Sequence, residues 1–155
     1  MSQIDSIGAI ILPMTSRIVV DTSVFISALI GPRGPARELL RRCFLGEYVP
    51  VMGNALFNEY EAVRVRPEIV ARCPLSAEDC DALALDFYSI CLWIKIHFLW
   101  RPNLRDAGDD HLVELALASG APCIATHNLA DFRRSELRFP GLTIATPADI
   151  LTKGH

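Results

Sequence analysis

The chain has 155 residues, of which 51% are hydrophobic and 21% are charged, and its formal net charge is −3. This length predicts one domain with a single core, and the composition excludes a chain that is disordered throughout. The acidic balance gives no overall footprint for strong nucleic-acid binding, so a nucleic-acid partner requires a local basic patch or bound cations. No uncharged apolar stretch reaches the ~18–20 residues that a membrane-spanning helix needs.

Periodicity and turn residues divide the chain into strands and helices. Residues 1–16 are expected to be an N-terminal extension, with one domain over residues 17–155. In chain order, this domain is predicted to contain a strand at residues 18–20, helices at 24–30 and 36–45, a strand at 48–52, helices at 54–65 and 76–90, a strand at 92–98, a helix at 109–119, strands at 121–126 and 142–145, and a helix from Pro147. Asn54 and Ser76 are suited to cap two of these helices, and Pro67 is suited to stop or kink the first of them.

Strands that alternate with helices predict an α/β protein. We expect a three-layer α/β/α sandwich with a central, mainly parallel sheet, because right-handed connections place helices on both faces. In such sheets, ligands bind beyond the carboxyl ends of the strands. Asp21 follows the first predicted strand at that edge, so its carboxylate is expected to point into a polar site.

Five cysteines occur, at positions 43, 73, 80, 91 and 123. Their number is odd and none forms a Cys-x-x-Cys pair, which favours small buried thiols of a reducing cytosol over a zinc site. The apolar run near the N-terminus has no basic segment before it, so no signal peptide is expected. These features predict a cytoplasmic protein.

Several polar side chains follow different predicted elements at the same edge of the sheet. Besides Asp21, they are Glu59, Asp106, Asp109, Asp110, Asn128 and Asp131. Carboxylates gathered within ~4–6 Å repel one another, and a hard divalent cation such as Mg²⁺ or Mn²⁺ relieves that repulsion. Such an ion lowers the pKa of a bound water and clamps phosphate oxygens, so the pattern favours phosphoryl chemistry.

These residues also have structural interpretations. Asp21 and Asp109 are suited to turns or helix caps, and Glu59 alone is typical of a solvated helix face. Asn128 is suited to a left-handed turn. Three histidines form no spaced ligand set, which favours core or surface roles; they are His97, His111 and His127.

Three stretches of the chain resemble the PIN domain, the metal-dependent nuclease fold of many bacterial toxin–antitoxin toxins. VVDTSVFISAL is similar to the family's first motif, with Ser23 where Asn is commoner, and NALFNEYEAV is similar to the helix that carries the family's Glu. The run FLWRPNLRDAGDDHLVELALASGAPCIATHNLADF resembles the third and fourth motifs. With PGLTIATPADIL after it, the chain is similar to the VapC-like branch of toxin components, over about residues 17–151.

This resemblance implies a metal-dependent endoribonuclease that uses Mg²⁺ or Mn²⁺ to activate water. It implies that Asp21, Glu59 and Asp109 are catalytic residues and metal ligands, and that Asp106 and Asn128 belong to the metal site. Supporting roles are implied for Thr22, Thr126 and Asp131. The implied partners are an RNA substrate, a cognate antitoxin protein of a type II pair and a second copy of the chain in a homodimer.

Other functions stay open on sequence grounds. A PIN relative without activity would act as a binding module or scaffold. A phosphoryl-transfer domain with an Asp nucleophile requires a second Asp where Ser23 stands, and a receiver domain requires an Asp pair and a Lys that neither Lys95 nor Lys153 supplies. Four arginines near the first long loop either guide a phosphate backbone or form a solvated helix face, and the acidic net charge favours the second role. They are Arg33, Arg37, Arg41 and Arg42.

Overall fold

The computed structural model describes residues 3–4, 10–11, 16–96 and 110–153. Its centre is a five-stranded sheet in the order β5-β4-β3-β6-β7, with every neighbouring pair parallel. The strands are β3 (Arg17–Val20), β4 (Val49–Met52), β5 (Leu92–Trp93), β6 (Cys123–Ala125) and β7 (Thr143–Ala145). A separate antiparallel pair joins β1 (Gln3–Ile4) to β2 (Ile10–Ile11).

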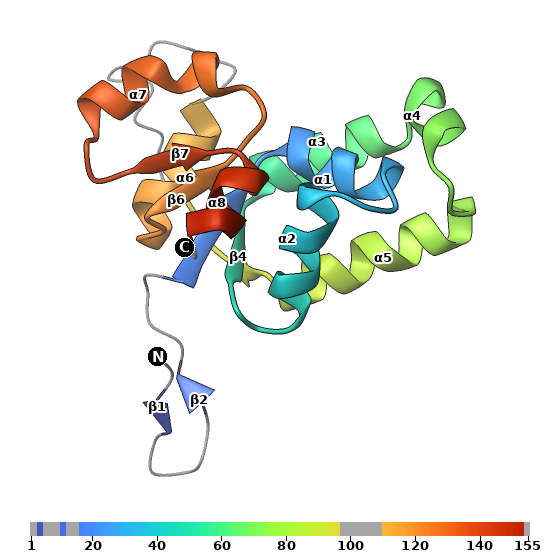
Figure 1. Ribbon diagram of the computed structural model, residues 1–155, viewed down its shortest axis with the longest axis horizontal. Helices are drawn as coiled ribbons and strands as arrows, with labels where there is room; N and C mark the ends of the chain where they lie inside the picture. Colours follow the sequence, from blue (N-terminus) through green and yellow to red (C-terminus); the bar gives the residue numbers. More distant parts are fainter. Residues whose placement is uncertain (1–2, 5–9, 12–15, 97–109, 154–155) are drawn as a thin grey trace.

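Helices cover the central sheet and complete the predicted three-layer α/β/α fold, which is confirmed. They are α1 (Thr22–Ile30), α2 (Pro35–Phe44), α3 (Asn54–Arg64), α4 (Pro67–Arg72), α5 (Ala77–Ile90), α6 (Asp110–Ser119), α7 (Arg133–Arg138) and α8 (Pro147–Lys153), with the 3-10 helix η3 (Leu129–Phe132). Helix α6 packs across β3, β4 and β6, while α1 and α2 pack together and α8 contacts α2. Figure 1 shows α7 beyond the β7 edge and the α4–α5 pair at the opposite end of the molecule.

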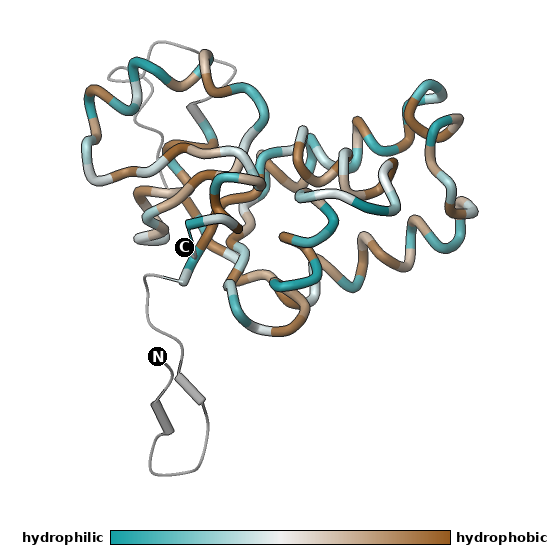
Figure 2. Tube along the Cα trace, viewed as in Figure 1, coloured by the Kyte–Doolittle hydropathy of each residue, from teal (hydrophilic) through white to brown (hydrophobic). Residues whose placement is uncertain are grey.

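The middle strand β3 is buried along its length. Ile18, Val19 and Val20 are each at most 1% exposed, because β4 and β6 flank the strand and helices cover the sheet. A strand buried on both faces is apolar at successive positions rather than at alternate ones. Figure 2 shows this as hydrophobic colour through the strands of the sheet. Strand β3 therefore ends inside the buried core.

An aromatic cluster joins three helices beside β3. The rings of Phe25 on α1 and Tyr60 on α3 are stacked, with centroids 4.3 Å apart and an interplanar angle of 17°. Phe87 on α5 lies against the same Phe25 ring at 5.4 Å. All three side chains are fully buried, so α1, α3 and α5 share one rigid contact next to the end of β3.

Several predicted element boundaries are wrong. Gly53 rather than Asn54 is the N-cap of α3, and Asn54 is its first helical residue. Pro67 ends one helix as predicted but also starts α4, since proline is well suited to the first turn of a helix. Residues 94–96 of the strand predicted at 92–98 are not in a strand. Neither η3 nor α7 was predicted.

Other local predictions are confirmed. Ser76 caps α5, and its hydroxyl accepts a 3.1 Å hydrogen bond from the Asp79 N–H. All five cysteines are free thiols, but only Cys43 and Cys123 are buried as expected, and the other three are partly exposed. Among the described residues, no helix is both long enough and apolar enough to cross a membrane.

Candidate active site

Asp21 is the first residue after β3 and the N-cap of α1. Its backbone N–H donates to the Ala125 carbonyl at 2.9 Å, which continues the pairing of β3 with β6. Its side chain makes no capping hydrogen bond, although the residue is only 6% exposed. The capping interpretation of this carboxylate is therefore wrong, and the group is held by other partners.

Those partners are two hydroxyl groups. Asp21 Oδ2 accepts hydrogen bonds from Thr126 Oγ1 at 2.6 Å and from Ser23 Oγ at 3.2 Å. Within the described part of the chain, neither a hydrogen bond to Oδ1 nor an ion pair to this carboxylate is present. The carboxylate is thus fixed on one oxygen by neutral donors, and its charge has no described cationic partner.

The segment after β6 completes this arrangement. Thr126 is fully buried, and its Oγ1 accepts from the Asn128 N–H at 3.0 Å while it donates to Asp21. A hydroxyl has one proton, so the Asn128 N–H leaves that proton free to point at the carboxylate. The His127 N–H donates to Ser23 Oγ at 3.3 Å, which ties the same segment to the start of α1.

Glu59 reaches the same edge of the sheet through its neighbour Tyr60. The Tyr60 hydroxyl donates to the Val20 carbonyl at 2.5 Å, so α3 is attached to β3 one residue before Asp21. Burial raises the pKa of Tyr60 well above its ordinary value, which keeps this donor protonated. One hydrogen bond therefore places the two segments that carry Asp21 and Glu59 side by side.

His111 is the direct partner of Glu59. Its Nε2 lies 3.3 Å from Glu59 Oε2, and the two side chains are 13% and 39% exposed. The hydrogen bond with His111 is the main cause that lowers the pKa of Glu59; burial opposes it, and the Thr22 hydroxyl adds to the lowering. This contact also places the first turn of α6 beside Glu59. The sequence assigned His111 a core or surface role, although its position directly after two acids was a usable signal.

The remaining predicted residues fall into two groups. Asp106 and Asp109 lie outside the described residues, so their places in the site stay predictions. Asn128 and Asp131 are exposed near η3, and the Asp131 N–H donates to the Asn128 carbonyl at 3.1 Å. The left-handed turn suggested for Asn128 is wrong, because its φ is −103°. No described contact brings the Asp131 side chain to Asp21.

A cavity of about 240 Å³ lies next to Glu59 and shares His111 with it. It is lined by residues 53–56, 94–96, His111, Glu114 and Leu115, which belong to the start of α3, the segment that follows β5 and one face of α6. Glu114 is 4% exposed and lies three residues after His111, so both share that face. His111 was expected to have a core or surface role, and Glu114 was not among the predicted site residues.

Three of the four arginines near the first long loop, Arg37, Arg41 and Arg42, are engaged within the chain. Arg41 binds Glu38 through Nε at 2.9 Å and through a second nitrogen at 2.8 Å, and Arg42 adds a 3.1 Å contact. These two partners lower the pKa of Glu38 to about 2. Arg37 donates to the Ala28 carbonyl at 2.7 Å. The solvated helix face is therefore the better interpretation of this group.

The described residues supply part of a donor set for a hard divalent cation. The described residues contribute a buried carboxylate with one free oxygen, Asp21 Oδ1, and the ionised Glu59. Carboxylate oxygens are the ligands that Mg²⁺ and Mn²⁺ prefer. Within the described ranges no group of three or more His, Cys, Asp or Glu residues could hold a metal ion.

Comparison with known families agrees with this geometry. A search of curated proteins found no match to the chain. A family model described as PIN domain matches residues 17–130, which include β3, α3, α6 and β6. The chain therefore belongs to the PIN domain family, whose members are generally nucleases.

Proposed function

We propose that residues 17–155 form a metal-dependent endoribonuclease, the toxin of a type II toxin–antitoxin pair. The observation that carries the proposal is Asp21, a buried carboxylate at the end of the central strand, which is oriented by two hydroxyl groups and has no described cationic partner. Burial of an uncompensated charge is costly, and a bound cation removes that cost. Membership of a family of nucleases supports the reaction class.

In this proposal, Asp21, Glu59 and Asp109 are the catalytic residues and hold Mg²⁺ or Mn²⁺, with Asp106 and Asn128 completing the site. A divalent ion held there would lower the pKa of a bound water and offset the charge of phosphate oxygens. Asp109 is included because it precedes α6 by one residue in the sequence, and the first turn of α6 lies beside Glu59.

The surrounding residues keep the two described carboxylates ready to bind. Thr126 and Ser23 fix the orientation of Asp21 through their hydroxyls. His111 holds Glu59 and lowers its pKa, which offsets the opposing effect of burial. Thr22 is proposed to assist Glu59, since its buried Oγ1 has no hydrogen-bond partner among the described residues, and the backbone N–H of Asp131 stabilises the turn at Asn128. These roles are those of groups that position ligands rather than react.

The proposed substrate is RNA, and the proposed partners are an antitoxin protein and a second copy of the chain in a homodimer. The setting that we propose is the cytoplasm. A net charge of −3 and arginines that are paired within the chain support a bound cation, rather than a broad basic surface, as the main attraction for phosphate. A binding module without activity is the alternative that the following experiment tests.

The test is cleavage of a mixed single-stranded RNA pool by the purified full chain with Mg²⁺ or Mn²⁺, with a matched DNA pool in parallel. Asp21→Asn removes the charge of the carboxylate but keeps an oxygen that accepts from Thr126. Asp86→Asn is the matched control, since Asp86 is exposed on α5. We expect cleavage by the parent chain and by Asp86→Asn, and none by Asp21→Asn or with EDTA.

Divalent-ion binding, measured by calorimetry, separates the other outcomes. Metal binding that Asp21→Asn abolishes, without cleavage of the pool, would indicate a competent site with a narrow target. Cleavage of DNA but not RNA would replace the substrate class and leave the nuclease assignment intact. Absence of both metal binding and cleavage would refute the enzyme and leave a binding module.

A further inference from the structure

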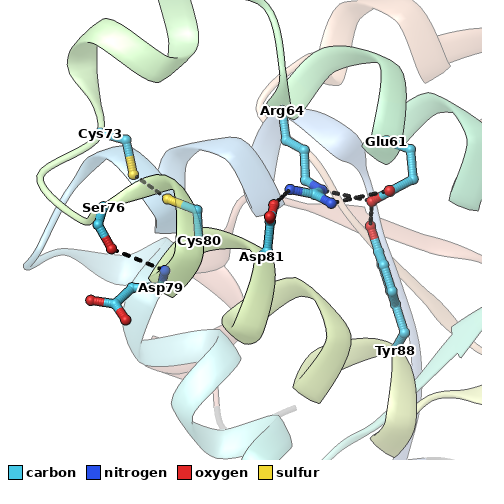
Figure 3. A network of polar contacts seen from close by, with 8 residues as sticks. All are labelled: Glu61, Arg64, Cys73, Ser76, Asp79, Cys80, Asp81 and Tyr88. Atoms are coloured by element: carbon cyan, nitrogen blue, oxygen red, sulfur yellow. Dashed lines mark hydrogen bonds and ion pairs between the residues drawn. The ribbon is translucent and has the colours of Figure 1, made fainter.

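Two of the five thiols lie in contact where α4 meets α5. Cys73 is the C-cap of α4 and Cys80 lies in the first turn of α5, and Figure 3 shows their side chains pointing toward each other. Their Sγ atoms are 2.8 Å apart. Both side chains are partly exposed. Cys43 and Cys123 are buried in the core, and the Cys91 thiol donates to the Phe87 carbonyl at 3.2 Å. Cys91 is also partly exposed, but Cys73 and Cys80 are the two partly exposed thiols that lie in contact with each other.

The local structure holds this pair in place before any bond forms. The Cys73 thiol lies 3.4 Å from the Leu29 carbonyl, which anchors it against the end of α1. Ser76 caps α5 through the Asp79 N–H, and this fixes the turn between the two cysteines (Figure 3). A disulfide has an S–S distance of about 2.05 Å, so the sulfurs need only a small approach. The chain need not unfold to bring them together.

We propose that Cys73 and Cys80 are a redox modification site, at which a small-molecule disulfide such as glutathione disulfide converts the two thiols into an intramolecular disulfide. The thiolate of one cysteine attacks a sulfur of glutathione disulfide, which forms a mixed disulfide and releases glutathione. The second thiolate then attacks the protein sulfur of that mixed disulfide, forms the Cys73–Cys80 bond and expels a second glutathione. Two electrons and two protons pass from the cysteines to two glutathione molecules.

The reaction is expected to be slow at neutral pH. Burial, with the hydrogen bond to Cys73, raises the pKa of the Cys80 thiol to about 11, and thiolates are the reactive species. Uncatalysed disulfide rearrangement takes minutes to hours. Proximity favours the second step, because the resolving thiol is already in contact with its target.

The disulfide would join two helices at a point that already supports α3. Asp81, next to Cys80, binds Arg64 of α3 at 2.6 Å, and Arg64 also binds Glu61 at 2.6 Å (Figure 3). A bond at Cys80 therefore links α4 to the same turn of α5 that holds α3. Closing this short loop is expected to raise the melting temperature by about 5–10 °C.

The test uses the folded full chain with glutathione disulfide, followed by an acid quench, alkylation in denaturant so that the buried thiols also react, and mass spectrometry. We expect the thiol count to fall from five to three, with the mass loss of two hydrogen atoms, and to return to five with dithiothreitol. Trypsin leaves Cys73, Cys80 and Cys91 in one peptide, residues 73–95, so a second cleavage after Glu78 is required. Fragments 73–78 and 79–95 then stay joined until they are reduced, and because the second fragment carries both Cys80 and Cys91, the variants separate a bridge to Cys80 from a bridge to Cys91.

Three variants make the assignment specific. Cys73→Ser and Cys80→Ser are expected to lose both the bridge and the rise in melting temperature. Cys91→Ser is the matched control and keeps the bridge, because a serine hydroxyl retains the hydrogen bond to Phe87. A native chain that keeps five thiols, a bridge to Cys43 or Cys91, a glutathione adduct without a bridge, or a bridge that forms only in urea would each overturn the proposal.

Discussion

The hydrogen bond from the Tyr60 hydroxyl to the Val20 carbonyl attaches α3 to β3, and its contribution can be tested by removing one oxygen atom. Tyr60→Phe removes the hydroxyl but keeps the ring that stacks on Phe25. In this variant, the Val20 carbonyl loses its hydrogen-bond donor, and because the surroundings are fully buried, water does not replace it. A hydrogen bond of this kind contributes about 1 kcal/mol, and an unsatisfied buried acceptor adds to the loss, so we expect the free energy of unfolding to fall by about 1–2 kcal/mol.

Urea denaturation followed by circular dichroism measures this change, with the m-value expected to stay constant. Tyr88→Phe is the matched control, because it removes a hydroxyl that donates to Glu61 at 2.6 Å and costs about 1 kcal/mol without touching the Val20 carbonyl. Only Tyr60→Phe is expected to reduce divalent-ion affinity, since only it loosens α3 at Glu59. Equal effects of both variants on metal binding, or no loss of stability in Tyr60→Phe, would refute the reasoning.

Three further outcomes follow from individual contacts. Ser76→Ala removes the cap of α5 and is expected to cost about 1 kcal/mol in a urea titration; no change would mean that the cap is replaced by solvent. Arg64, with help from Tyr88, lowers the pKa of Glu61, so the stability that Glu61 contributes is complete above its unfolded-state pKa near 4.5 and is lost as the pH falls through the lower folded-state pKa. The gap in melting temperature between the parent chain and Glu61→Gln should therefore close in acid, and a gap independent of pH would contradict this. His111→Ala is expected to weaken Mg²⁺ binding by about 10–100-fold in calorimetry, because Glu59 loses its partner, and unchanged affinity would remove His111 from the site.

The layers of the fold could be predicted because the strongest signals in the chain are local. Three consecutive β-branched residues mark β3 as a strand buried on both faces, and the structure places it in the middle of the sheet. The boundaries of the elements were harder to predict, because the same capping residue or proline can stand before, within or after a helix. Pro67 is an example: the same fixed φ that ends α3 is suited to the first turn of α4.

The candidate site was partly predictable for a different reason. Asp21 was found because a carboxylate after a buried parallel strand lies at the edge where ligands bind. The partners of the acids were not predictable from spacing, because His111 is 52 positions away from Glu59 and Thr126 is 105 positions away from Asp21. Such pairs are created by packing of distant elements. Thr126 and Thr22 were named only through the resemblance to a family.

The burial of Asp21 is expected to lower the stability of the folded chain without a cation, although the proposed metal site requires this carboxylate. A last test compares these two effects. A carboxylate that is 6% exposed and held by two neutral hydroxyls is an unfavourable group for the folded chain without a cation. Asp21→Asn removes that charge, so in EDTA the variant is expected to melt at or above the temperature of the parent chain. With Mg²⁺, the parent chain alone should gain stability, because only its folded state binds the ion. A variant that is strongly destabilised in EDTA would instead make Asp21 a structural residue, and the argument for a metal site at the end of β3 would fail with it.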